Sequence, residues 1–143
     1  MKTVLFLYDN SAPAQRALDR LVEDTNNRPG VHIHVLNVQP HPDTYGRNPL
    51  ALEVVERLKD SARSFAAEIC AKAEARLEAA GIACSSHPAL GHVLDQANHI
   101  IKHNKCDTVV MGTRGMGGVG NLLLGSVAMQ VVHGVPVPVL LVK

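Results

Sequence analysis

Short apolar runs that alternate with helix-patterned segments constrain the fold of this chain more than any other feature. Residues 4–8 form one such run and residues 108–111 form another. Neither has the alternation of apolar and polar residues that marks a strand with one wet face, so each predicts a strand buried on both faces. Strands of this kind belong to parallel sheets whose crossover connections are helices. The sequence therefore predicts an α/β fold, a doubly wound five-stranded parallel sheet with helices on both faces.

The other elements follow without a linker or repeat that would divide residues 1–143 into two domains. We expect further strands over residues 31–38, 82–89 and 138–142. We expect one helix that begins at Ser11 and three more over residues 50–80, 91–103 and 127–133. The longest helix carries an apolar stripe that we expect to face inward, with the members Val55, Leu58, Ala62, Phe65, Ile69, Ala73 and Leu77. Gly81 is the expected stop of this helix.

Composition argues against several classes of function. A net charge of +1 gives neither nucleic acid nor an anionic membrane an electrostatic reason to bind. Two Phe, two Tyr and no Trp are too few for a base-stacking platform. The opening apolar run is too short for a secretory signal, and no stretch approaches the roughly 20 apolar residues of a membrane span. Three cysteines without CxxC spacing indicate reduced thiols, and we expect a cytoplasmic location.

Glycines after the fourth predicted strand give the strongest functional signal. Gly112 and Gly115 stand three positions apart, and nine residues separate Gly115 from the pair Gly125 and Ser126. Glycines at a strand end let the backbone approach a ligand closely, and the first amides of a helix attract anions. Arg114 adds a positive charge between the first two glycines. The segment therefore predicts a phosphate cradle, and nucleotide binding is the first hypothesis.

Two familiar nucleotide motifs fit this segment less well. Gly115, Gly117 and Gly120 match the GxGxxG pattern of dinucleotide-binding folds, but that site needs an acidic residue about 20 positions later. No Asp or Glu follows Asp107. Residues 120–126 have the spacing of a P-loop, with Ser where the phosphate-binding Lys belongs. A loop whose glycines only serve turns is a third interpretation, although five glycines in nine residues exceed what turns require.

The spacing Gly112-x-x-Gly115, nine residues, Gly125-Ser126 resembles the nucleotide-binding signature of the universal stress protein family, in its ATP-binding branch. The resemblance covers the whole chain, from the first strand and its terminal Asp9 to the closing apolar strand. It implies a five-stranded parallel α/β fold of the adenine-nucleotide α-hydrolase-like type. It also implies a domain over residues 1–143, usually dimeric, that binds ATP with Mg²⁺.

The resemblance assigns roles to particular residues. It implies that Asp9 holds the ribose and that the backbone of Val38 reads the adenine edge. It places a second group around the ribose and phosphates, namely Gly112, Arg114, Gly115, Gly125, Ser126 and Val127. The sheet supports this independently, because ligands bind at the carboxyl ends of parallel strands near the point where strand order reverses. The residue after this Asp is commonly Gly or Phe in the family, whereas here it is Asn10.

Hydrolysis of ATP needs a base or a positioned water beside the outer phosphate, and the glycine-rich segment offers no carboxylate. We therefore expect an ATP-binding regulatory switch of the stress-response type, with weak ATPase activity at most and no catalytic residues. The alternative is a dimeric interaction protein of the same fold that binds no nucleotide. An intact glycine signature favours the first interpretation, because the non-binding branch of the family typically lacks it.

Two histidine pairs and the last strand complete the sequence-based expectations. His99 with His103, and His32 with His34, have spacings that suit two-histidine metal sites, but no acid or cysteine completes either pair. We expect solvated histidines and no protein-held metal. The last strand begins near Val137, ends at Val142 and contains prolines typical of a sheet edge, so we expect a homodimer through this strand.

Overall fold

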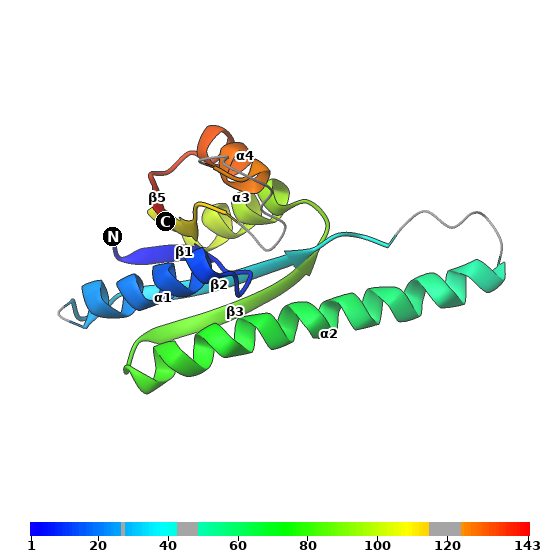
Figure 1. The fold of residues 1–143 in the computed structure, drawn as a ribbon, viewed down its shortest axis with the longest axis horizontal. Coiled ribbons are helices and arrows are strands. Elements are labelled where there is room, and N and C mark those ends of the chain that lie inside the picture. The colour runs from blue at the N-terminus through cyan, green and yellow to red at the C-terminus, as the bar shows by residue number, and fades with distance from the viewer. Residues whose placement is uncertain (27, 43–48, 115–123) are drawn as a thin grey trace.

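Five parallel strands form one sheet in this computed structural model, which describes residues 1–26, 28–42, 49–114 and 124–143 (Figure 1). The strands are β1 (Thr3–Leu7), β2 (His32–Gln39), β3 (Ala83–Leu90), β4 (Thr108–Gly112) and β5 (Val139–Val142). The helices are α1 (Ala12–Thr25), α2 (Pro49–Ala79), α3 (Val93–Asn104) and α4 (Ser126–Gly134). All four strand pairings are parallel, which confirms the predicted fold class.

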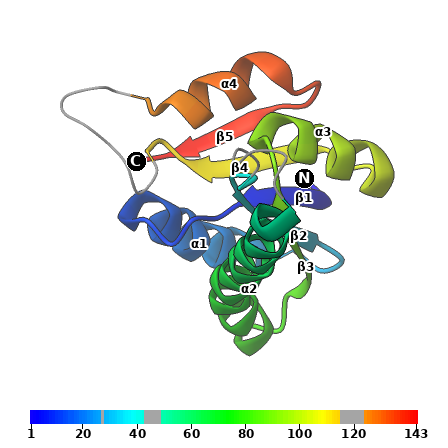
Figure 2. The same ribbon diagram turned by 90° about the vertical axis from the view of Figure 1, so that its right-hand side faces the viewer.

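Helices cover both faces of the sheet. Figure 2 shows α1 and α2 on one face and α3 and α4 on the other. Val4 and Phe6 of β1 pack into the core under α1 and α2, whereas Leu5 and Leu7 pack into the core under α3 and α4. All four side chains are buried. Because both faces of β1 are dry, its sequence lacks the polar alternation of a half-exposed strand.

The order of the strands, β3-β2-β1-β4-β5, reverses direction at β1. The chain moves outward from β1 to β2 and β3, then returns across the sheet to β4 on the other side of β1. The loops that follow β1 and β4 therefore leave the carboxyl edge of the sheet toward opposite faces. In open α/β sheets this divergence leaves a crevice in which ligands bind.

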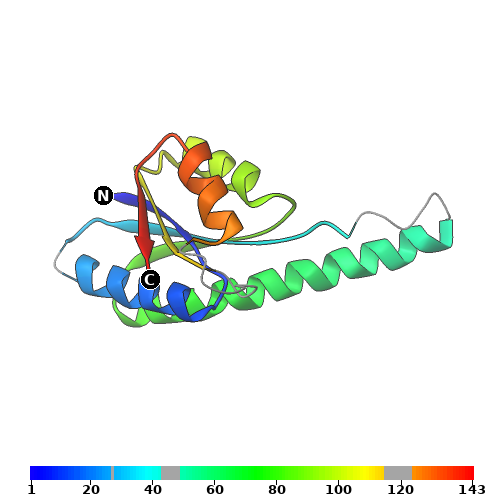
Figure 3. The ribbon, with the colours of Figure 1, turned by 45° about the horizontal axis from the view of Figure 1, so that its top comes forward.

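Helix α2 is longer than the sheet that it covers, and Figures 1 and 3 show its N-terminal half extending beyond the body. Ile69 and Leu77 are buried, as the apolar stripe predicts, but Leu58 and Phe65 are 42% and 54% exposed. The expectation that the whole stripe faces inward is therefore wrong for its first half. The helix stops before Gly81, whose φ of +72° is the left-handed conformation of a helix-terminating glycine. No helix within the described ranges is long and apolar enough to cross a membrane.

Candidate functional site

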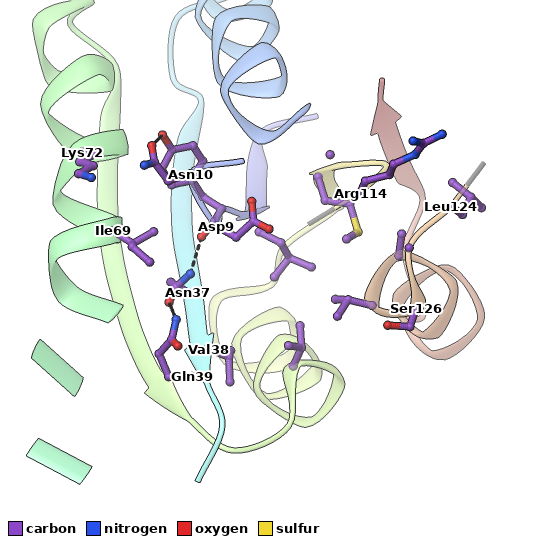
Figure 4. A pocket seen from close by; sticks show the side chains of 18 of the residues that line it. Asp9, Asn10, Asn37, Val38, Gln39, Ile69, Lys72, Arg114, Leu124 and Ser126 are labelled. Atoms are coloured by element: carbon purple, nitrogen blue, oxygen red, sulfur yellow. Dashed lines mark hydrogen bonds between the residues drawn. The ribbon is translucent and has the colours of Figure 1, made fainter. Parts of the chain in front are cut away.

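A pocket of about 800 Å³ opens at the carboxyl edge of the sheet, where the strand order reverses. The ends of β1, β2 and β4, the first turn of α4 and one side of α2 line it (Figure 4). The structure brings together in this pocket seven of the eight predicted site residues, Asp9, Val38, Gly112, Arg114, Gly125, Ser126 and Val127. The eighth, Gly115, lies outside the described residues.

The end of β1 is a tight polar turn. Asp9 accepts a hydrogen bond through Oδ1 from the N–H of Ser11 at 3.0 Å. Ser11 caps α1, because its Oγ accepts from the N–H of Ala14 at 3.3 Å. Between them Asn10 has φ +64°, a left-handed conformation that Asn tolerates better than most residues. The turn therefore fixes the Asp9 backbone at the pocket edge and starts α1 at the same time.

Tyr8 forms part of the pocket wall, and its ring belongs to the core under α1 and α2. Only 4% of the residue is exposed, and its ring centroid lies 5.4 Å from that of Phe6. The hydroxyl donates to Oδ1 of Asn10 at 2.9 Å, which supports the left-handed turn. Burial raises the pKa of this phenol, so it stays neutral and keeps its donor. A bulky residue is accommodated before Asp9 because it packs inward.

The end of β2 presents its backbone to the pocket. Pairing of β1 with β2 ends at Leu7 and Leu36, followed by one bond from the N–H of Tyr8 to the Leu36 carbonyl at 3.0 Å. Since successive residues of a strand direct their N–H and C=O groups to opposite edges, those of Val38 lie on the β1 side, beyond the last paired residue. Val38 therefore offers a neighbouring donor and acceptor at the pocket, the pattern that an adenine edge complements.

The side chain of Asn37 closes the gap between β1 and β2. Its Nδ2 donates to the carbonyl of Tyr8 at 2.8 Å, and its Oδ1 accepts from Nε2 of Gln39 at 2.8 Å (Figure 4). The Gln39 carbonyl faces the other way and accepts from the N–H of Gly91 at 2.9 Å. This amide chain holds the ends of β1, β2 and β3 together, so the pocket edge is defined by hydrogen bonds.

Gly112 ends β4 where no side chain fits. A Cβ there would lie 2.8 Å from the backbone N of Ala14 and 2.9 Å from the carbonyl carbon and Cβ of Pro13. The glycine predicted from its position near a ligand is thus also required for β4 to pack against the first turn of α1. Ser11 Oγ extends this contact by donating to the carbonyl of Arg114 at 3.2 Å.

The two halves of the glycine signature meet at Thr113. Its carbonyl accepts from the N–H of Gly125 at 2.8 Å, and its own N–H donates to the carbonyl of Val142 in β5 at 2.8 Å. Gly125 is the N-cap of α4 and provides no side-chain cap, so the N–H groups of the first turn, beginning at Ser126, have no intrahelical partner. These amides, the positive end of the helix dipole and Arg114 make this end of the pocket suitable for anions.

Sequence reasoning missed the wall that α2 contributes. Phe65, Ile69 and Lys72 lie one helical turn apart on one side of α2 and line the pocket opposite α4. Phe65 and Ile69 belong to the predicted apolar stripe, which was the available signal. The sequence does not say which strand ends the stripe crosses, so their place at the pocket could not be inferred.

No histidine is among the described residues that line this pocket. His34 Nδ1 lies 2.9 Å from His87 Nε2, and His32 Nε2 lies 2.9 Å from Ser85 Oγ, all on β2 and β3. Burial, with smaller contributions from His32 and His87, lowers the pKa of His34 to about 4. The ring centroids of His99 and His103 lie 4.2 Å apart on α3, with the ring planes tilted by 50°. Among the described residues, no three His, Cys, Asp or Glu side chains are arranged to hold a metal ion.

These features define a doubly wound α/β domain with a polar and apolar pocket at its strand-order reversal. The chain belongs to the Universal stress protein family, whose family model matches residues 1–143. It is 36% identical over 143 residues to "Universal stress protein in QAH/OAS sulfhydrylase 3'region" of Thermus aquaticus, covering 99% of this chain and 98% of that protein. The recognition from the glycine spacing is thereby confirmed at the level of the family.

Solved structures confirm the fold. That of the hypothetical protein MJ0577 has a TM-score of 0.85 at 24% identity and covers 99% of this chain and 95% of its own. The universal stress protein family protein At3g01520 from Arabidopsis thaliana, whose structure has AMP bound, has a TM-score of 0.70 at 18% identity. It covers 100% of this chain and 92% of its own.

Proposed function

We propose that residues 1–143 act as one domain that binds adenine nucleotide, with ATP and Mg²⁺ as its ligand. The observation that carries this proposal is the convergence of three different groups on one pocket. These are the carboxylate of Asp9, the backbone N–H and C=O of Val38 beyond the last paired residue of β2, and the N-terminus of α4 beside Arg114. A carboxylate suits ribose hydroxyls, a backbone edge suits adenine, and helix amides with a guanidinium suit phosphates.

In this binding mode the base lies over the apolar floor of the pocket on the α3 and α4 side. Leu7, Met111 and Ala128 belong to the core on that face and also line the pocket. Asp9 accepts from a ribose hydroxyl, and the phosphates extend past Gly112 toward Gly125, Ser126 and Val127. Gly115 stays part of the proposed signature on sequence grounds alone. The N–H of Gly125 already donates to Thr113, so the amides from Ser126 onward meet the phosphate oxygens. Mg²⁺ would be held by phosphates and water.

Relatives support the ligand class. AMP is bound in the structure of the Arabidopsis family member, which shares this fold. The pocket of the present chain presents groups that suit each part of such a molecule. An adenine nucleotide is therefore the ligand to test first.

We propose a regulatory role, with little or no hydrolysis. Among the described residues that line the pocket, Asp9 is the only carboxylate, and none is a histidine or cysteine. If Asp9 binds ribose, no described lining residue is left to activate water at the outer phosphate. The site therefore suits a protein whose ATP-bound state is recognised by a partner better than it suits an ATP-hydrolysing enzyme.

Calorimetric titration of the nucleotide-stripped protein with ATP and Mg²⁺ tests the proposal. We expect micromolar binding that weakens about tenfold or more in Arg114→Ala, because a charge-assisted hydrogen bond contributes about 1.5–3 kcal/mol. Arg63→Ala is the matched control, since Arg63 pairs with Asp60 on α2 and does not line the pocket. A folded wild-type protein that binds no ATP would refute the proposal and favour an interaction protein without nucleotide.

We also propose that the chain forms a homodimer through β5. Among the described strands this one is the last in the sheet order and pairs with β4 alone, so no described strand covers its other edge. Leu140 is 39% exposed on it, and Val132 of α4 adds further exposed apolar surface. An apolar edge strand is protected from unspecific pairing when a second copy covers it.

A further inference from the structure

The pocket continues beyond the space that the proposed nucleotide occupies. Figure 4 shows Asp9 near its middle, with Arg114 and Ser126 on one side and Ile69 and Lys72 of α2 on the other. We call the part between β2 and α2 the α2 lobe; its lining residues are Asn10, Gln39, Phe65, Ile69 and Lys72. The proposed binding mode for ATP uses none of these five residues.

One wall of the α2 lobe combines an aromatic face with a positive charge. Phe65 is 54% exposed and lines the pocket, so its side chain is accessible to a ligand there. Ile69, next along the same side of the helix, is 6% exposed and closes the wall toward the core. Lys72 follows, and it is exposed at the pocket. An aromatic face beside a cation is the arrangement that binds a planar base and its phosphate.

The opposite wall offers hydrogen-bonding groups that the described residues leave unused. Gln39 donates through Nε2 to Asn37, while no described donor contacts its Oε1. Asn10 accepts through Oδ1 from Tyr8 and Gln15, while no described acceptor contacts its Nδ2. The lobe thus presents one acceptor and one donor, and a nucleobase edge presents complementary groups.

Resting on the proposed function, we propose that the α2 lobe binds a second nucleotide unit, so that the chain prefers a dinucleotide to a mononucleotide. Asp9 lies between the lobes and accepts from the 2′-hydroxyl of the first ribose, while the linking phosphate leaves the neighbouring 3′-oxygen toward α2. Lys72 then neutralises the phosphate that links the two units, and the second base stacks on Phe65. Gln39 contacts the polar edge of that base, whereas Asn10, which Figure 4 shows at the other end of the lobe, donates to the linking phosphate.

Titration with two probes, AMP and the 5′-phosphorylated linear dinucleotide pApA, tests this inference. We expect pApA to bind at least about tenfold more tightly than AMP to the wild-type protein. Phe65→Ala should reduce that preference by about fivefold or more, the lower end of what base stacking on an aromatic ring contributes. Lys72→Met should reduce it by about tenfold, because it removes a charged hydrogen bond to the linking phosphate. Neither substitution should change the affinity for AMP, because the mononucleotide lies on the other side of Asp9.

Matched controls come from the same helix. Leu58→Ala removes another exposed apolar residue of the stripe, and Lys59→Met removes another lysine, and neither residue lines the pocket. Both should retain the full preference for pApA. The chain has no Trp, so Phe65→Trp introduces a single tryptophan, whose emission can be excited separately from that of the two tyrosines. Its emission should be quenched by pApA and unchanged by AMP.

Three results would overturn the inference. The first is equal affinity of the wild-type protein for pApA and AMP. The second is an equal loss of both affinities in the Phe65 and Lys72 variants, which would place the mononucleotide itself against α2. The third is a Phe65→Trp emission that responds to AMP as strongly as to pApA. Absence of binding for both probes would instead refute the proposed nucleotide site, and a dinucleotide preference would fall with it.

Discussion

Replacing Gly112 with Ala separates two explanations for this glycine. If the residue only lets a ligand approach, the added methyl group weakens binding and leaves the stability of the protein unchanged. In the structure the new Cβ would stand 2.8 Å from the Ala14 nitrogen and 2.9 Å from two atoms of Pro13, where ordinary contacts begin near 3.4 Å. The first turn of α1 must therefore move by about half an ångström, whether or not a ligand is present.

The size of the effect follows from what has to move. Overpacking a core costs about 1–3 kcal/mol, and the upper part of that range applies because backbone and a proline ring relax poorly. The shift also strains the Ser11 cap of α1 and the bond from Ser11 to Arg114, and a helix cap contributes about 1 kcal/mol. We expect Gly112→Ala to lower the free energy of unfolding by about 3 kcal/mol.

Urea unfolding followed by circular dichroism measures this loss without ligand. With a slope of about 2 kcal/mol/M, the midpoint should fall by about 1.5 M. Gly134→Ala is the control, because the three atoms nearest to its Cβ all belong to the side chain of Leu94, which can turn aside more readily than backbone, and a loss below about 1 kcal/mol is expected. A Gly112→Ala midpoint equal to that of the wild type, or equal to that of Gly134→Ala, would refute the packing argument.

Three further substitutions test other parts of the structure. The folded-state pKa of His34 is about 4 against an ordinary 6.5, so the unfolded chain takes up a proton first and stability falls as pH drops from about 6.5 toward 4. Between pH 7 and pH 5 the free energy of unfolding of the wild-type protein should fall by about 2 kcal/mol. Urea titrations at both pH values should show a smaller fall in His34→Gln, and an equal fall would contradict this role of His34. Tyr8→Phe should cost about 1 kcal/mol by removing the bond to Asn10, and an unchanged urea midpoint would exclude that contribution. Leu140→Lys should halve the mass measured by light scattering while Leu58→Lys leaves it unchanged; a dimer that survives Leu140→Lys would rule out the β5 interface.

The strands and helix ends could be predicted because their causes are local. An apolar run such as residues 108–111 identifies a strand with two dry faces, and Ser11 and Gly81 mark a helix start and a helix end by their own chemistry. The gathering of Asp9, Val38 and Gly112 at one edge also followed, since parallel strands place all their carboxyl ends together. For these features the sequence pattern and the packing point to the same arrangement.

What the sequence could not provide depends on contacts between distant segments. Periodicity shows which side of α2 is apolar, but the length of the sheet beneath it decides that Ile69 is buried and Leu58 is exposed. The steric reason for Gly112 arises from α1, about a hundred residues earlier in the chain. His32 and His34 were expected on one face, but their neighbour His87 became apparent only from the register of β2 against β3.

Thr113 connects the proposed nucleotide site to the proposed dimer edge and allows one further prediction. Its carbonyl is bonded to the cap of α4 and its N–H to the end of β5 at Val142. A nucleotide that binds Arg114 and the first turn of α4 restrains the residue after Thr113 and the helix to which its carbonyl is bonded. It should therefore also restrain the end of β5, which a second copy covers in the proposed dimer. We expect ATP to lower the dimer dissociation constant by about fivefold or more, the lower end of typical coupling between sites. Because coupling is reciprocal and each copy in the dimer binds one ATP, the ATP affinity per site measured above and below the dimer dissociation constant must differ by the square root of that factor, about twofold or more. Analytical ultracentrifugation with and without ATP measures the change in the dimer dissociation constant, and calorimetry measures the change in ATP affinity. A dimer dissociation constant that ATP leaves unchanged would show that Thr113 does not couple the nucleotide site to the dimer edge.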